Sequence, residues 1–204
     1  MQRIVKSMQR TAIVFFFIFA LQTYSQEQKL VILHTNDVHS NLTGFGPESD
    51  YSPLSVNDDL TRGGFARLQT LIRQLSDENP ETSLVVDAGD FLMGTLFHSL
   101  EEETGFQLRM MKKMGYDYVT LGNHEFDFGP ETLANTIQAA LDDGEIPGII
   151  ASNIIFSEEP GDDELEKLYH QGIIKPYQII NHGNLKIGII GLMGENAAED
   201  APAS

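Results

Sequence analysis

Asp, His and Asn residues cluster in three short segments of the 204-residue sequence. Asp37 and His39 stand two positions apart, Asp90 follows a glycine, and residues 122–125 read Gly-Asn-His-Glu. Carboxylate oxygens, imidazole nitrogens and amide oxygens are common ligands of divalent metals. One Asp-x-His pair occurs by chance in many proteins. Three such segments in order, each directly after an apolar run, indicate one shared metal site.

The spacing of these residues suits a pair of cations. In an extended segment Asp37 and His39 point the same way and can hold one cation together. The two oxygens of Asp90 can bridge two ions, and Asn123 offers a neutral carbonyl oxygen to the second. Two cations so placed clamp a phosphate oxygen and lower the pKa of a bridging water, and the resulting hydroxide attacks phosphorus. The pattern therefore favours hydrolysis of phosphoric esters.

A histidine and an aspartate beside these ligands form a candidate dyad. Asp127 lies three residues after His124, close enough across a turn to hold one imidazole nitrogen. The other nitrogen could stabilise the phosphoryl charge or protonate a leaving alkoxide. The alternative is a purely structural His-Asp pair. For Glu125 we expect a structural role as an anchor of its loop.

Apolar runs and helical patterns predict the elements that position these segments. Short apolar runs predict strands at residues 29–33, 84–86, 116–121 and 148–151. Apolar residues at helical spacing predict helices from Gly64 to Asn79, from Glu102 to Gly115 and from Pro130 to Leu141. Residues 41–62 should form a long loop, residues 157–167 an acidic loop or short exposed helix, and residues 178–190 a hairpin. This alternation predicts an α/β layered domain whose strand ends meet at one edge of the sheet.

Composition excludes several classes of protein. The chain has 30 acidic and 13 basic residues and a net charge of -17, whereas a nonspecific binder of nucleic-acid polymers needs a basic face. It has no cysteine, which excludes disulfides, thiolate zinc sites and a cysteine nucleophile. With 41% hydrophobic and 21% charged residues, the composition is ordinary for a folded protein and argues against global disorder.

The amino terminus reads as a secretory signal peptide. Residues 1–25 combine three basic residues with an unbroken apolar run at 12–21, and small residues allow cleavage after Ser25. The run is shorter than the roughly 20 apolar residues that span a bilayer, and an uncleaved anchor is the alternative. No later segment could span a membrane. We expect a mature domain at residues 26–204 that is periplasmic or extracellular.

The three motifs in this order resemble the calcineurin-like metallophosphoesterase superfamily. Residues 34–39 (HTNDVH), 63–68 (GGFARL) and 122–128 (GNHEFDF) are similar to its 5′-nucleotidase branch. That branch includes periplasmic UDP-sugar hydrolases and 2′,3′-cyclic-nucleotide phosphodiesterases. The resemblance implies a layered sandwich of two mixed sheets flanked by helices. It also implies that the metal ligands are Asp37, His39, Asp90 and Asn123. The catalytic dyad that it implies is His124 with Asp127.

The sequence departs from the family pattern toward its end. The family completes its site with a later histidine and a Gly-His-x-His segment, and adds a carboxyl-terminal nucleoside-binding domain. After His124 the sequence has only His170, in the acidic segment, and His182, in the hairpin turn, where a solvent-facing role is expected. We therefore expect residues 26–204 to be the amino-terminal part of the domain, with a site that is incomplete in this chain.

These observations predict a metal-dependent phosphoric-ester hydrolase, most like a 5′-nucleotidase acting on extracytoplasmic nucleotides. Its cofactors would be two divalent ions, and the His, Asp and Asn ligands do not choose among Zn²⁺, Mn²⁺ and Co²⁺. The first alternative is a non-catalytic secreted fragment that binds a metal or ligand. The second is a sugar-phosphate or cyclic-nucleotide phosphoesterase on the same scaffold.

Overall fold

The computed structural model describes residues 28–45, 62–158 and 160–197. The predicted signal peptide at residues 1–25, most of the predicted loop at 41–62 and the end of the chain at Ser204 lie outside the described residues. Within the described residues, no helix has both the length and the apolar character needed to cross a membrane.

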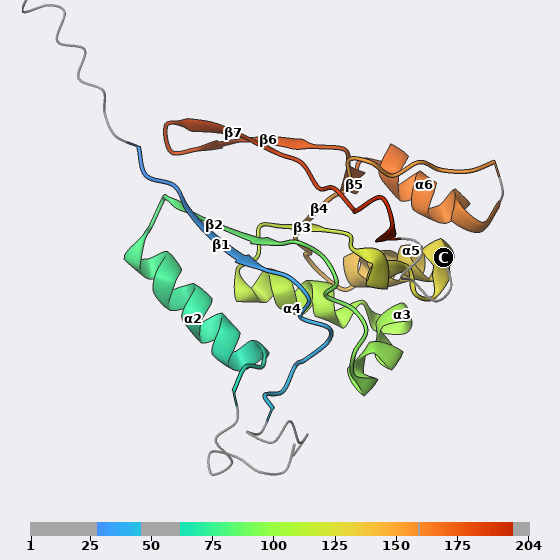
Figure 1. The fold of residues 1–204 in the computed structure, drawn as a ribbon, viewed down its shortest axis with the longest axis horizontal. Helices are drawn as coiled ribbons and strands as arrows, with labels where there is room; N and C mark the ends of the chain where they lie inside the picture. The colour runs from blue at the N-terminus through green and yellow to red at the C-terminus, as the bar shows by residue number, and fades with distance from the viewer. Residues whose placement is uncertain (1–27, 46–61, 159, 198–204) are drawn as a thin grey trace, which may run out of the picture.

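A parallel sheet of five strands forms the centre of the fold (Figure 1). Its strands follow the order of the sequence, namely β1 Val31–Thr35, β2 Ser83–Asp87, β3 Tyr118–Thr120, β4 Gly148–Ile150 and β5 Ile174–Lys175. The first four are the predicted strands, with shifted ends. The fifth has two residues, too few for a periodic signal in the sequence. Parallel pairing places the carboxyl ends of β1, β2 and β3 side by side.

Helices flank this sheet (Figure 1). They are α2 Phe65–Glu78, α3 Glu101–Thr104, α4 Phe106–Met114, α5 Gly129–Asp142 and α6 Asp163–His170. The predicted helix after Glu102 is divided in two, because Gly105 adopts a left-handed conformation with φ of 51°. A Cβ atom at Gly105 would lie 2.4 Å from the Thr136 carbonyl oxygen on α5, so close packing requires glycine there. Leu71, one of the apolar residues at helical spacing in α2, is 51% exposed.

A second, antiparallel sheet lies on the other side of the parallel sheet from α2 and α4 (Figure 1). Its strands are β6 Gln178–His182 and β7 Leu185–Ile189, the predicted hairpin. His182 lies in β6 rather than in the turn and is half-buried, unlike the prediction, whereas His170 at the end of α6 is exposed. A parallel sheet flanked by helices together with a second small sheet confirms the predicted fold class.

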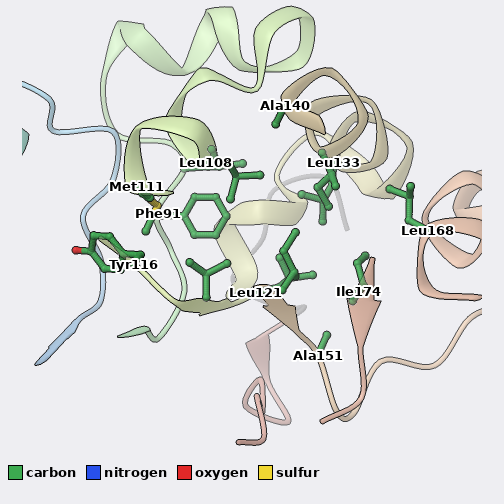
Figure 2. Close-up of a cluster of buried hydrophobic side chains, with 14 of the residues drawn as sticks. Phe91, Leu108, Met111, Tyr116, Leu121, Leu133, Ala140, Ala151, Leu168 and Ile174 are labelled. Carbon is green, nitrogen blue, oxygen red and sulfur yellow. The ribbon is translucent and has the colours of Figure 1, made fainter. Parts of the chain in front are cut away.

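A continuous apolar core fills the space between the parallel sheet and the helices (Figure 2). Phe91, Leu108 and Ile137 are completely buried in it. Met111 and Met114 of α4 are 1% and 6% exposed and belong to this core, and Met110 packs against it partly buried. Each large apolar side chain buried this way stabilises the fold by roughly 1.5–3 kcal/mol. This packing holds the ends of β2 and β3 in fixed positions.

Glu101, the first residue of α3, is a buried carboxyl group that should make stability depend on pH. It is 1% exposed, and its Oε2 atom accepts a hydrogen bond from the Gln107 amide at 3.3 Å. Burial raises the pKa of Glu101 from 4.5 to about 8. The folded protein therefore holds a proton that the unfolded chain releases, and this contribution is lost as the pH rises from about 4.5 to about 8.

The substitution Glu101→Gln should remove that dependence, because glutamine resembles the protonated acid. At pH 8 we expect the variant to exceed the wild type in free energy of unfolding by on the order of 2–4 kcal/mol, with little difference at pH 4.5. Urea denaturation at the two pH values measures this. Glu102→Gln, at the exposed neighbour, is the matched control. Equal stability differences at both pH values would show that Glu101 does not retain its proton.

Candidate metal centre

The segments that follow β1 and β2 remain paired beyond the ends of the strands. The amides of Asp37, His39 and Ser40 donate to the carbonyls of Gly89, Asp90 and Phe91, at 3.0–3.1 Å. These hydrogen bonds join backbone atoms only, so the backbone alone fixes the two polar segments against each other. The first two predicted metal-binding segments therefore lie together at the carboxyl edge of the sheet.

The backbone around the site is unusual for residues other than glycine. Asp37, His39 and Asp90 have φ values of 53°, 44° and 56°, in the left-handed region. Each such residue costs about 1–2 kcal/mol relative to the ordinary conformation. The extended geometry assumed for Asp37 and His39 was therefore wrong. Their side chains nevertheless converge, because Asp37 Oδ1 lies 3.7 Å from His39 Nε2.

Three side chains from three different loops present ligand atoms to one point. One atom each from His39, Asp90 and His124 lie within 4.8 Å of one another. The two imidazole rings meet edge to face with centroids 5.0 Å apart. The Nδ1 atom of His39 donates to the Leu92 carbonyl at 3.2 Å, which leaves Nε2 for the site. Two imidazoles and a carboxylate fit a borderline-soft divalent ion such as Zn²⁺, Mn²⁺ or Co²⁺.

Asn123 occupies the turn that closes over Asp90. It begins the short 3₁₀ helix Asn123–Phe126, directly between Gly122 and His124. The His124 amide donates to Asp90 Oδ1 at 3.0 Å. A Cβ atom at Gly122 would lie 2.2 Å from that same oxygen, so only glycine allows this approach. The third segment is thereby fixed against the Asp90 carboxylate, with Asn123 beside it.

The predicted pairing of His124 with Asp127 is present. His124 Nδ1 donates to Asp127 Oδ2 at 2.8 Å, and Asp127 is 4% exposed. This hydrogen bond is the main cause that raises the pKa of His124 above its ordinary value. The bond orients the ring and leaves Nε2 as the nitrogen available to the site. Because His124 also belongs to the converging group, its geometry allows either proton transfer or metal binding.

Glu125 connects the second polar segment, around Asp90, with the third, around His124, through its buried carboxylate. It is 3% exposed, and its carboxylate accepts hydrogen bonds from the amides of Gly122, Asp90 and Leu92, at 2.6, 2.9 and 2.9 Å. Burial raises its pKa to about 7. These contacts support the anchoring role expected for Glu125, and they hold Asp90 and the turn after Gly122 in one unit.

Another buried carboxyl group, Asp87, escaped the sequence analysis. It is 3% exposed, accepts hydrogen bonds from the Thr35 hydroxyl and from the Gly89 amide at 3.0 Å, and has its pKa raised to about 6 by burial. The Thr35 hydroxyl also lies 2.7 Å from the Tyr116 hydroxyl. Asp87 could be seen in the sequence as a polar strand end, but no periodicity showed that its side chain points inward.

Comparison with known proteins agrees with this geometry. Residues 30–196 match the model of the calcineurin-like phosphoesterase family. The chain is 37% identical to rat 5′-nucleotidase over 164 residues, which cover 80% of this chain and 26% of that protein. It superposes on the Haemophilus influenzae NAD nucleotidase with a TM-score of 0.63 and 31% identity, covering 83% of this chain and 30% of that one.

A second solved structure gives the same result. The Thermus thermophilus 5′-nucleotidase precursor matches with a TM-score of 0.62 and 29% identity, over 82% of this chain and 29% of that one. The chain thus spans about a quarter of the length of the curated relative and under a third of the solved structures. The match extends over both sheets and all three polar segments, and the chain belongs to the calcineurin-like phosphoesterase family.

Proposed function

We propose that the protein is a metal-dependent phosphoric-ester hydrolase that acts on nucleotides, in the manner of a 5′-nucleotidase. The convergence of His39, Asp90 and His124 at one edge of the sheet supports this proposal most directly. The likeness to rat 5′-nucleotidase supports nucleotides as the substrate class. A pocket of carboxylates and imidazoles without bound cations would repel a phosphate, so the hydrolase function depends on divalent metals.

We assign Asp37, His39, Asp90 and Asn123 as the residues that hold two divalent ions. Asp37 and His39 lie within 3.7 Å of each other, and Asp90 lies between them and the third segment. Ions bound there would polarise the phosphoryl oxygens and activate a water molecule. The protein supplies the rigid frame, because Glu125 fixes the amides on both sides of Asp90.

His124 would act on the phosphoryl group or on the leaving oxygen. Asp127 accepts a hydrogen bond from its Nδ1 atom, which leaves Nε2 for the site, and in the protonated ring this nitrogen is a hydrogen-bond donor. A donor in this position stabilises the charge that develops on the leaving alkoxide and can pass it a proton. The buried position of Asp127 keeps this orientation fixed during the reaction.

We also propose that the protein is exported through its amino-terminal segment. The basic residues and the apolar run within residues 1–25 support this. Amino-terminal sequencing of the protein recovered from the periplasm or the medium should begin at Gln26. Recovery of the intact amino terminus from the cytoplasm would contradict export.

A phosphatase assay of the full-length gene product tests the proposed function. AMP, UDP-glucose and 2′,3′-cyclic AMP are the informative substrates, and we expect AMP to be hydrolysed. A chelator should abolish turnover, and addition of Mn²⁺, Co²⁺ or Zn²⁺ should restore it. Turnover that is insensitive to chelation would contradict a metal-dependent mechanism. Metal binding without turnover of any substrate would favour the non-catalytic alternative.

A further inference from the structure

The ring of His39 is held by a peptide group in the loop after β2. Its Nδ1 atom lies 3.2 Å from the Leu92 carbonyl oxygen, and because a carbonyl can only accept, Nδ1 carries the hydrogen. Nε2 is then the nitrogen without a hydrogen, which is the form that binds a cation. The hydrogen bond of the other ring nitrogen sets the tautomer and orientation of a histidine ligand. Whatever fixes the Leu92 carbonyl therefore also fixes His39.

The same peptide group is bound at its other end by a second histidine, His98. The Leu92 carbonyl and the Met93 amide belong to one planar unit, which we call the bridging peptide, and neither can turn without the other. The Met93 amide donates to His98 Nδ1 at 3.3 Å. Two imidazole rings thus hold opposite ends of the bridging peptide, and His98 is connected through it to the predicted ligand His39.

The bridging peptide lies in an orientation that the chain alone does not favour. Met93 has a φ of 63°, in the left-handed region that residues with a side chain rarely adopt. Rotation of the bridging peptide changes ψ of Leu92 and φ of Met93 together, and a half-turn would return Met93 to the ordinary region. The same rotation would break the hydrogen bonds to His39 and His98. The two imidazoles therefore hold the bridging peptide against a local preference.

The residues on either side of the bridging peptide are anchored independently of it. The Leu92 amide donates to Glu125 Oε1 at 2.9 Å. Further along the loop, Thr95 Oγ1 donates to the Ser40 carbonyl at 2.7 Å. Loss of the hydrogen bond to His98 should therefore change the orientation of the bridging peptide rather than the path of the whole loop.

His98 is itself held in place as a neutral acceptor. It lies in the 3₁₀ helix Leu96–Leu100, and its ring stacks on Phe128 with centroids 5.1 Å apart and an angle of 15°. An imidazole nitrogen accepts a hydrogen bond only while it carries no proton. Burial lowers the pKa of His98 below its usual value, against the opposite effect of the Asp127 carboxylate. The ring is therefore available to accept the Met93 amide.

We propose that His98 is a positioning residue of the metal centre, which holds His39 in its metal-binding tautomer through the bridging peptide. This inference rests on the proposed function, in which His39 binds a divalent ion. Loss of a group that orients a metal ligand costs about 10–100-fold in metal affinity. Because His98 acts through a peptide group rather than directly, we expect a loss of about tenfold.

Two substitutions separate the hydrogen bond of His98 from the shape of its ring. His98→Phe keeps a flat ring against Phe128 but has no acceptor, and it should weaken Mn²⁺ binding about tenfold. His98→Asn loses the ring but offers an amide oxygen close to the position of Nδ1, and it should restore most of the affinity. Calorimetric titration of the metal-free, full-length gene product with Mn²⁺ measures both. His170→Phe, at the exposed histidine of α6, is the matched control and should bind as the wild type does.

The tautomer of His39 gives a second readout that needs neither metal nor turnover. In the metal-free wild type, the nitrogen chemical shifts of the His39 ring should place the hydrogen on Nδ1. In His98→Phe the Nε2–H tautomer should gain population, whereas His98→Asn should resemble the wild type. Urea denaturation of each variant shows whether it keeps the fold, which a loss of the acceptor alone should preserve.

The outcomes separate this inference from the proposed function. If AMP is hydrolysed but His98→Phe binds Mn²⁺ as tightly as the wild type, His98 does not position the metal centre, although the hydrolase function stands. Equal losses of affinity in His98→Phe and His98→Asn would also overturn the inference, since packing of the ring would then be the cause. If no substrate is hydrolysed, the proposed function fails, and the tautomer of His39 decides. A change in His98→Phe would support the inference, and an unchanged tautomer would overturn it.

Discussion

Replacing Asp90 with alanine is expected to abolish turnover and to remove most of the bound metal. Asp90 is the carboxylate that comes from the middle of the three strands, next to both neighbouring segments. Its Oδ1 atom also accepts the His124 amide at 3.0 Å. The substitution therefore removes a ligand and releases the turn that carries Asn123. Loss of a residue that only supports ligands already costs 10–100-fold in metal affinity, so loss of this one should cost more than about 100-fold.

Metal content after dialysis and the rate of AMP hydrolysis measure this effect. Asp90→Asn is the informative second variant, because an amide oxygen can still accept the His124 amide but carries no charge. It should keep the fold and still lose metal. Asp77→Ala, at an exposed position of α2, serves as the control. Activity and metal content close to wild type in Asp90→Ala would refute the assignment of Asp90 to the metal centre.

Much of the fold was predictable because local pattern and tertiary structure agree. The apolar runs before the polar segments form β1, β2 and β3, and parallel pairing of these strands is enough to gather their ends. The hairpin β6–β7 was predictable for the same reason, since its apolar residues flank a turn that contains Gly183. These features depend on residues that are neighbours in sequence.

The features that the sequence did not predict depend on contacts between residues far apart in the chain. Gly105 interrupts a helical pattern because the backbone of α5 passes too close for a side chain at this position. The spacing of apolar residues in the sequence does not indicate this close approach. Asp87 is buried because Thr35, from β1, lies within reach to pair with it. A carboxylate that is buried by a partner 52 positions away looks in the sequence like any other polar strand end.

The site was predictable in its residue types but not in its conformation. Alternation along a strand suggested that Asp37 and His39 converge, whereas the structure achieves this through left-handed backbone at both residues. Such conformations persist only where surrounding hydrogen bonds hold them. Here the carbonyls of Gly89 and Asp90 accept the amides of the two residues. The strain is therefore maintained by the second segment, and this can be seen only once both segments are placed.

Replacing His124 with asparagine is expected to lower kcat by about 10²–10⁴-fold while metal content stays near that of the wild type. The reason is that its Nδ1 atom is engaged by Asp127, so the ring acts through Nε2 as an oriented donor. Asp127→Asn should lower kcat in the same direction, because the amide no longer fixes the tautomer. His170→Asn, at an exposed histidine of α6 that is 3.2 Å from Glu166 Oε1, is the matched control.

The same pair of measurements decides between the two roles that the geometry of His124 allows. Its ring lies 5.0 Å from that of His39, and one of its nitrogens belongs to the converging group with Asp90. If His124 were a ligand, asparagine would reduce metal content and turnover together, and excess Mn²⁺ would recover part of the activity. If it is the donor, excess metal changes nothing, because the missing group acts on the leaving oxygen. A loss of metal in His124→Asn but not in Asp127→Asn would therefore move His124 from the dyad to the metal ligands.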